Sequence, residues 1–208
     1  MEQRQNTRTQ KTRERLRAAA HQLFLQQGYQ GTSIEGILAE AGISSKETFY
    51  RHYANKEALF VDVLRHLTME MPRFSEKLET LSPAHDLASL RQVLATLAYE
   101  ILATINQPGY LPLIRMIITE MPRFPQLGTL FFSTVTQRGI SIITAQLRAA
   151  KVQEIIADVD VDAVAYTLLG GLLTYVVMHR LLAGEEVQDS SSDHANAVIE
   201  VIMRSLRP

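Results

Sequence analysis

Cysteine and tryptophan are both absent from this sequence of 208 residues, and aromatic residues make up only 7% of it. Without cysteine the chain can form no disulfide, no thiolate zinc site and no cysteine nucleophile. A secretory signal is not expected, because the first 17 residues contain no apolar segment, and this favours the cytoplasm. The longest uncharged run, residues 163–178, is shorter than the roughly 20 residues of a membrane-spanning helix. We interpret it as a buried helix and expect no membrane partner.

The alternation of apolar and polar residues that marks a half-buried strand is also missing. Apolar residues recur instead at spacings of three and four, the pattern of an amphipathic helix, as in Leu16, Ala19, Ala20, Leu23 and Phe24. Hydrophobic residues make up 46% of the sequence, which is enough for a sizeable core. The sequence therefore predicts an all-α fold of about nine helices.

Capping patterns, glycines and prolines place the helix boundaries. Gly28 is expected to end the first helix, and Pro72 the fourth, where we place a hinge. Capping boxes at 32–35 and 44–47 are expected to open the second and third helices, and Asn55 to cap the fourth. The predicted helices span residues 12–27, 34–41, 44–53, 56–71, 84–105, 111–120, 126–150, 160–183 and 193–206.

Charge is distributed unevenly, although the net charge is only −1. Residues 1–56 contain nine Lys and Arg against five Asp and Glu, a net charge of +4. Residues 57–208 contain twelve against seventeen, a net charge of −5. A basic N-terminal segment followed by an acidic remainder indicates an end that binds a polyanion.

The third predicted helix, SSKETFYRHY at 44–53, follows the second after a tight Ala-Gly-Ile turn, which is the spacing of a helix-turn-helix motif. Phe49 and Tyr53 are expected to face the core, and the polar groups left outside suit phosphates and base edges. Glu47 is expected to turn back onto the Ser44 amide as part of the capping box. A face that is simply solvated is the alternative, and this helix alone leaves the two interpretations open.

Residues 28–60, GYQGTSIEGILAEAGISSKETFYRHYANKEALF, resemble the DNA-binding signature of the TetR family of transcriptional regulators. The likeness includes the Gly-Tyr pair, the Thr-Ser start of the second helix, the Ala-Gly-Ile-Ser turn, the Thr-Phe-Tyr triplet and the Lys-Glu-Ala-Leu start of the fourth helix. It implies an N-terminal three-helix helix-turn-helix domain, joined by the fourth helix to a larger helical domain that binds an effector and dimerises. We therefore divide the chain into residues 1–70, which include the connecting helix, and residues 71–208.

The resemblance also implies which side chains contact DNA. The expected set is Arg8, Lys11, Thr32, Ser33, Ser44, Ser45, Lys46, Thr48, Tyr50, His52 and Lys56. Thr32, Ser33 and Lys56 would bind phosphates, and Lys46 a base. The two residues of the N-terminal arm would add nonspecific, salt-dependent affinity, with a solvated tail as the alternative.

The last two predicted helices supply a surface for a homodimer. The helix over 160–183 is apolar around most of its circumference, and the resemblance implies a four-helix bundle with the last helix across a two-fold axis. The residues expected in this interface are Val161, Val164, Leu168, Leu169, Leu172, Val176, Val198, Ile199, Ile202, Met203 and Leu206. A core confined to one subunit is the alternative for these residues.

By the same resemblance, the middle helices over 84–150 form most of the effector site. The candidate contacts are Tyr99, Arg115, Met116, Thr119, Glu120, Phe131, Thr134, Gln137, Arg138 and Tyr166. Abundant Ile, Leu and Met indicate a largely apolar effector of unknown identity. We expect it to favour a conformation in which the fourth helix has moved and the two recognition helices no longer match their half-sites.

The sequence thus predicts a ligand-responsive transcriptional regulator, a repressor that binds a palindromic operator in double-stranded DNA as a homodimer and is released by a small effector. No cofactor or metal site is expected, since the six histidines show no ligand spacing. The motifs of metalloproteases, phosphate loops and serine hydrolases are missing, so no enzyme is expected. The alternative is a helical enzyme or a protein-binding adaptor without sequence-specific DNA binding.

Overall fold

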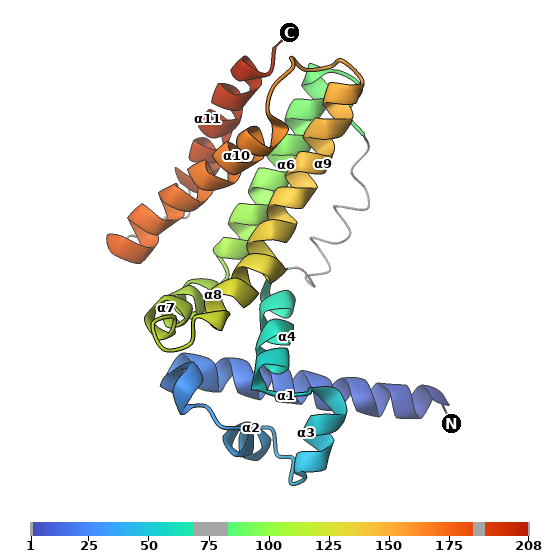
Figure 1. Ribbon diagram of the computed structural model, residues 1–208, viewed down its shortest axis with the longest axis vertical. Helices are drawn as coiled ribbons and strands as arrows, with labels where there is room; N and C mark the ends of the chain where they lie inside the picture. Colours follow the sequence, from blue (N-terminus) through green and yellow to red (C-terminus); the bar gives the residue numbers. More distant parts are fainter. Residues whose placement is uncertain (1, 69–82, 185–189, 208) are drawn as a thin grey trace. The chain divides into compact units, whose positions relative to one another are not determined.

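The computed structural model describes residues 2–68, 83–184 and 190–207. Every regular element in these ranges is helical, which confirms the predicted all-α fold (Figure 1). The elements are α1 (Glu2–Gly31), α2 (Ile34–Glu40), α3 (Lys46–His52), α4 (Lys56–Thr68), α6 (Leu87–Ile105), α7 (Tyr110–Glu120), α8 (Gln126–Phe131), the π-helical segment η1 (Phe132–Thr136), α9 (Gln137–Val152), α10 (Val161–Val176), the π-helical segment η2 (Val177–Leu182) and α11 (Ser190–Ser205).

The chain divides into two compact units. The first unit contains the described residues of 1–68 and 112–134, and the second contains those of 69–111 and 135–208. The predicted domain boundary after residue 70 lies close to Thr68, where the first segment of the first unit ends. Residues 112–134, however, belong to the first unit and not to the predicted effector domain. The predicted hinge at Pro72 lies outside the described residues.

Helix α1 is longer than the sequence predicts. It begins at Glu2 instead of residue 12, so the described backbone of the basic leader is helical as well. The helix departs from helical geometry at Gly28, where φ is 74°, as the predicted stop requires. A positive φ is unfavourable for a residue with a Cβ atom, and the Glu120 carboxylate lies where that atom would be.

The caps of the next three helices follow the predictions in part. Asn55 caps α4 as predicted, since its side-chain oxygen accepts from an amide three residues later at 2.8 Å. The hydroxyl of Ser33 caps α2 in the same way at 3.0 Å. Ser45 precedes α3 without a side-chain cap bond. Neither predicted capping box, at 32–35 or at 44–47, forms, because each N-cap falls one residue later than expected.

Residues 112–134 join the first unit through contacts with the end of α1. The Phe124 ring meets the Tyr29 ring edge-on at a centroid distance of 5.4 Å, and Arg123 donates to the side-chain oxygen of Gln30 at 2.8 Å. These partners are far apart in the sequence, so no local pattern indicates that they meet.

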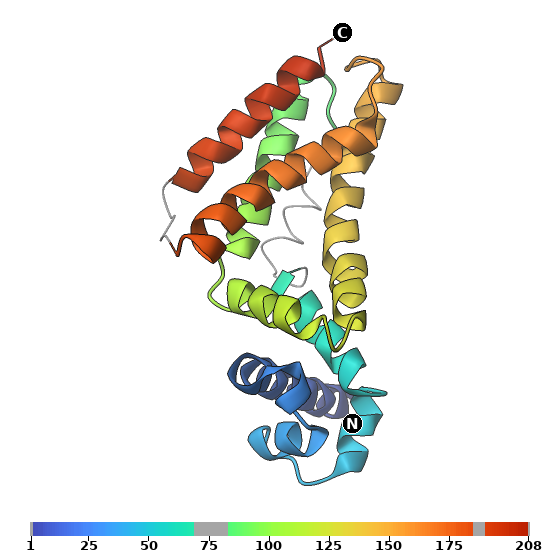
Figure 2. The ribbon, with the colours of Figure 1, turned by 60° about the vertical axis from the view of Figure 1, so that its left-hand side comes forward.

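Helices α6, α9, α10 and α11 form the core of the second unit. Helix α10 packs against the other three, and α6 also contacts α9 and α11 (Figure 2). The α6 start is fixed by a capping box in which the Ser89 amide donates to Asp86 at 2.7 Å. The fully or nearly buried aliphatic side chains of this core include Leu90, Leu94, Ile143, Leu147, Leu168, Leu172 and Ile199.

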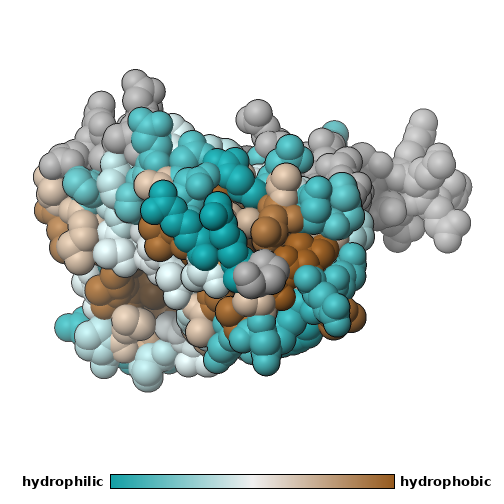
Figure 3. All heavy atoms as spheres, turned by 90° about the horizontal axis from the view of Figure 1, so that it is seen from above, coloured by the Kyte–Doolittle hydropathy of each residue, from teal (hydrophilic) through white to brown (hydrophobic). Residues whose placement is uncertain are grey.

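Two helices that the sequence predicts as continuous are interrupted by π-helical segments. The first, η1, falls within the predicted helix over 126–150, and η2 falls within the one over 160–183. The stretch Val161–Leu182 is long and apolar enough to cross a membrane. Its residues Leu168, Leu169 and Leu172 are buried in the core of the second unit, so we keep the interpretation of a core helix. In the space-filling view, apolar surface lies in separate patches between hydrophilic side chains (Figure 3).

Candidate nucleic-acid interface

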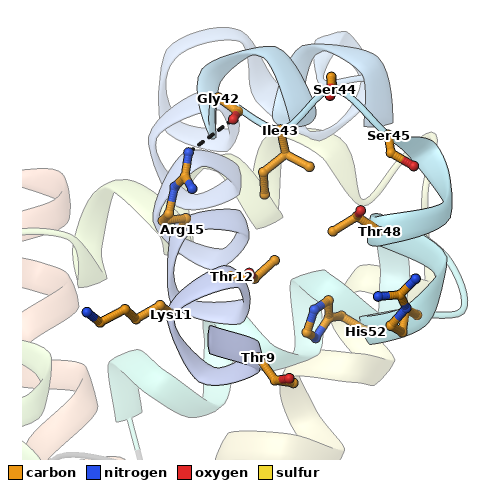
Figure 4. Close-up of a pocket in the computed structure, with 11 residues that line it drawn as sticks. Thr9, Lys11, Thr12, Arg15, Gly42, Ile43, Ser44, Ser45, Thr48 and His52 are labelled. Atoms are coloured by element: carbon orange, nitrogen blue, oxygen red, sulfur yellow. Dashed lines mark hydrogen bonds between the residues drawn. The ribbon is translucent and has the colours of Figure 1, made fainter. Parts of the chain in front are cut away.

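Helices α1 and α3 line a groove in the first unit (Figure 4). Its volume is about 720 Å³, and its lining residues are Thr9, Lys11, Thr12, Arg15, Gly42, Ile43, Ser44, Ser45, Thr48, Arg51 and His52. In Figure 4, Thr12, Ile43, Thr48 and His52 point into the groove, whereas Lys11 points away from it. Hydroxyl groups and cations predominate among these residues and none of them is acidic, so the groove suits an anionic partner.

The structure brings many of the predicted DNA contacts to this side of the first unit. The residues of the predicted recognition segment that line the groove are Ser44, Ser45, Thr48 and His52. Tyr50 lies on the outer face of α3 and is 55% exposed. Ser33 is exposed at the start of α2, and the side chain of Arg8 lies outside the described residues. Contact of these residues with DNA stays a prediction.

Both cations of α3 have an acidic neighbour. Lys46 pairs with Glu35 of α2, and Arg51 donates to Glu47 one turn earlier at 3.2 Å. The hydrogen bond between Lys46 and Glu35 raises the pKa of the lysine and lowers the pKa of the glutamate. The predicted return of Glu47 to the Ser44 amide is wrong: α3 starts one residue later than expected, and Glu47 instead pairs with Arg51.

Two predicted phosphate ligands are engaged within the protein. Thr32 is only 1% exposed and its hydroxyl donates to the Gly28 carbonyl at 2.8 Å, so a contact of this hydroxyl with phosphate does not fit the structure. Lys56 donates to the carbonyl oxygens of Tyr29 and Thr32 at 2.7 and 2.8 Å, and burial lowers its pKa. These bonds leave at most one of its three N–H groups for a phosphate.

A buried carboxylate that we did not predict from the sequence joins α1, α3 and α4. Asp62 is 3% exposed, accepts from the Tyr53 hydroxyl at 2.7 Å and from Arg13 Nε at 3.3 Å, and lies 3.7 Å from Arg17. Burial favours the neutral carboxyl, but the hydrogen bonds from Arg13 and Tyr53 outweigh it and hold the pKa of Asp62 below its usual value. The i,i+4 spacing of Arg13 and Arg17 was the available sequence signal.

Another arginine of α1 holds the turn between α2 and α3. Arg15 donates to the carbonyl oxygens of Ala41 and Gly42, the latter at 3.1 Å (dashed in Figure 4). A cation at the end of α2 also interacts favourably with the helix dipole. Part of the positive charge of residues 1–56 thus serves to assemble the first unit.

The predicted effector contacts divide between the two units. Those of the first unit are Arg115, Met116, Thr119, Glu120, Phe131 and Thr134. Those of the second are Tyr99, Gln137, Arg138 and Tyr166. Gln137 and Tyr166 line a groove of about 370 Å³ between α9 and α10, together with Arg148 and Asp162, which lie 3.7 Å apart. Met116 is buried, and the Tyr99 hydroxyl bonds within its own unit.

Most residues predicted to form a dimer interface are buried within one subunit. The side chains at most 8% exposed are Val161, Leu168, Leu169, Leu172, Val176, Ile199, Ile202, Met203 and Leu206. Val164 and Val198 are partly exposed. A side chain that its own subunit already covers has little surface left for a partner, so the burial of these nine residues favours the alternative, a core within one subunit. Which residues form the dimer interface stays a prediction.

A helix-turn-helix packed against α1 and α4, in a chain that also contains a second helical unit, is typical of helical DNA-binding regulators. Residues 16–63 match the family described as bacterial regulatory proteins, tetR family, and residues 92–206 match the AefR-like transcriptional repressor, C-terminal domain. The second match covers more than half of the chain. The chain therefore belongs to the TetR family of transcriptional regulators, which bind DNA, are typically ligand-responsive dimers and are generally not enzymes.

Relatives similar over nearly the whole chain agree with this assignment. The HTH-type transcriptional regulator UidR of Escherichia coli K12 is 26% identical over 190 residues, which cover 89% of each chain. A TetR-family regulator from Mesorhizobium loti has a TM-score of 0.75 and 26% identity, covering 97% of this chain and 99% of that one. The flavonoid-responsive regulator FrrA has a TM-score of 0.73 and 25% identity, covering 95% and 97%. The predicted helix-turn-helix domain with a larger helical domain is confirmed.

Proposed function

We propose that this TetR-family protein is a repressor that binds a palindromic operator as a homodimer and is released by a small, largely apolar effector. The observation that carries the proposal is the arrangement of α3, where Thr48 lines the groove and Lys46 and Tyr50 are exposed, in a unit that matches the family's DNA-binding region. A recognition helix places its N-terminal residues against base edges in the major groove. We therefore assign Lys46 to a base and Tyr50 to the sugar–phosphate backbone.

Repression is supported by the match of residues 92–206 to a domain described for a transcriptional repressor. Release follows from a population shift, in which the effector binds more tightly to a conformation whose recognition helices do not match the half-sites. Since the partner is chromosomal DNA, we place the protein in the cytoplasm.

A palindromic operator requires two copies of α3. We propose that two subunits supply them by pairing the outer faces of their α10 and α11 helices across a two-fold axis. The exposed or half-exposed residues on the outer face of α10 and η2 are Ala163, Tyr166, Thr167, Gly170, Thr174 and Met178. On α11 this face continues with Ala197 and Val201, of which Val201 is 65% exposed. We call these residues the outer stripe. Exposed small and apolar side chains at helical spacing are typical of a face that a partner covers.

The chemistry of the effector is supported by composition and by one relative. FrrA, at 25% identity, is described as responsive to flavonoids, which are flat aromatic molecules with a few hydroxyl groups. Such a molecule suits the Leu-, Ile- and Met-rich helices between residues 84 and 150. We therefore propose an aromatic, largely apolar effector.

The test is the enrichment of random and genomic duplexes by the purified protein, repeated with a panel of aromatic metabolites. We expect an inverted repeat whose half-sites lie one or more helical turns apart, about 34–36 Å per turn, and at least one compound that releases it. Lys46→Ala should abolish the enrichment without changing the melting temperature. Weak binding without sequence preference would contradict the proposal and support the adaptor alternative.

A further inference from the structure

The two cations of the recognition helix are both compensated in the DNA-free protein. Lys46 has Glu35 across the turn between α2 and α3, and Arg51 has Glu47 within α3. All four side chains are between 60% and 84% exposed. The exposed surface of α2 and α3 thus carries two positive and two negative charges that are paired with one another.

These pairs contribute little to folding, because water screens exposed charges and the side chains lose entropy when they pair. Their effect is larger when a duplex approaches. DNA carries one phosphate charge per roughly 1.7 Å of helix axis, and the attraction of free cations to it is independent of sequence. If Lys46 and Arg51 were unpaired, both cations would increase the affinity of the protein for every duplex. When they are paired, the increase in affinity is smaller, because two carboxylates also approach the phosphates.

The helix dipoles favour the pair between Glu35 and Lys46. Lys46 occupies the first position of α3, where the positive end of the dipole opposes a cation. Glu35 lies in the first turn of α2, where the same effect stabilises a carboxylate. The carboxylate is therefore held ionised next to an amine that needs a partner.

We propose that Glu35 and Glu47 are specificity-determining residues, which hold Lys46 and Arg51 away from duplexes that offer only phosphates. A duplex displaces Glu35 when it presents a better acceptor in the same place, such as guanine O6 and N7 in the major groove. Specificity is a difference between affinities, so a device that weakens wrong complexes more than the right one increases it. This inference rests on the proposed function of α3.

The test is a double-mutant cycle in the full-length protein, with wild type, Glu35→Gln, Lys46→Met and the double variant. Fluorescence anisotropy gives the Kd for a scrambled duplex in all four proteins, and the Kd for the enriched operator of equal length in wild type and Glu35→Gln, at one salt concentration. We expect Glu35→Gln to tighten the scrambled complex about three- to fivefold and the operator complex less than about twofold. In the Lys46→Met background this gain should disappear. Glu47→Gln with Arg51→Met repeats the cycle at the second pair.

Glu40→Gln is the matched control, because Glu40 is another exposed glutamate of α2 and the same charge is lost. The inference is wrong if Glu35→Gln increases the affinity for the scrambled duplex no more than Glu40→Gln does. It is also wrong if Glu35→Gln increases this affinity equally in the Lys46→Met background. In both cases general repulsion between carboxylates and phosphates explains the result. If wild type prefers no sequence, the proposed function itself fails, and this is visible before any variant is compared. Unchanged melting temperatures show that the variants are folded.

Discussion

Three helices of the DNA-binding unit meet at the carboxylate of Asp62. A buried charge is tolerated only when it is paired and hydrogen-bonded, and here Arg13 supplies a charged donor and Tyr53 a neutral one. Tyr53 is also the C-cap of α3, so its hydroxyl holds the end of the recognition helix against α4. The position of the outer residues of α3 thus depends on a contact made inside the unit.

We expect Tyr53→Phe to lower the free energy of unfolding by about 1–3 kcal/mol, because the Asp62 carboxylate loses a donor that water does not replace. Tyr50→Phe is the control: it removes the same atom from the same helix, but from a ring that is 55% exposed. Its effect should stay below about 0.5 kcal/mol. Urea denaturation measures both, and equal effects would show that Asp62 does not need the Tyr53 hydroxyl.

His21 should make the stability of the DNA-binding unit depend on pH. The Nε2 atom of His21 is buried and has no hydrogen-bond partner among the described residues. Burial, and to a lesser extent repulsion from the nearby His66, lowers the pKa of His21 below 6.5. A histidine with a lowered pKa binds fewer protons in the folded state than in the unfolded state, so its contribution is lost as pH falls through 6.5.

We therefore expect the free energy of unfolding to fall between about pH 7.5 and 5.5, and His21→Leu to remove part of this slope. His85→Leu is the control, since the His85 side chain is 81% exposed. Denaturation at several pH values measures the slopes. A slope that His21→Leu leaves unchanged, or that His85→Leu flattens equally, would contradict the assignment.

At the scale of elements, two glycines have opposite roles. Gly28 turns the chain at the end of the regular part of α1 with φ 74°, and an added methyl group would meet Glu120. Gly139 lies inside α9, and no atom lies within 4 Å of an added Cβ. We expect Gly28→Ala to destabilise the protein by about 1 kcal/mol or more and Gly139→Ala to stabilise it by about 0.5–1 kcal/mol. Thermal unfolding should show shifts of opposite sign, and shifts of the same sign would contradict this account.

The same elements show what a sequence can predict. Gly28 and Asn55 mark helix ends correctly, because a stop or a cap depends on a few adjacent residues. The spacing of Leu168 and Leu172 indicates that they are buried, but not whether their own subunit or a partner covers them. Likewise, the outward position of Lys46 and Tyr50 follows from helix periodicity. The Glu35 partner of Lys46 depends on how two helices pack, and the π-helical turns leave no periodic signal.

At the scale of the whole molecule, operator binding depends on two copies of α3 that act together. When one half-site is bound, the second recognition helix is already at a high local concentration, so a dimer gains far more affinity than a single subunit. A change that separates the subunits should therefore reduce operator binding without touching any residue of α3. The outer stripe of α10 and α11 is where the proposed dimer predicts this effect.

We expect Val201→Glu to make the protein monomeric, because the two-fold axis would bury a pair of unpaired carboxylates against apolar surface. Sedimentation equilibrium should show the monomer, and operator affinity should fall by about 100-fold or more, with helix content unchanged. Val152→Glu is the matched control: Val152 is 79% exposed at the end of α9 and lies outside the outer stripe, so this variant should stay dimeric. A Val201→Glu variant that remains dimeric would place the interface elsewhere. One that becomes monomeric yet keeps its operator affinity would show that a single recognition helix is sufficient.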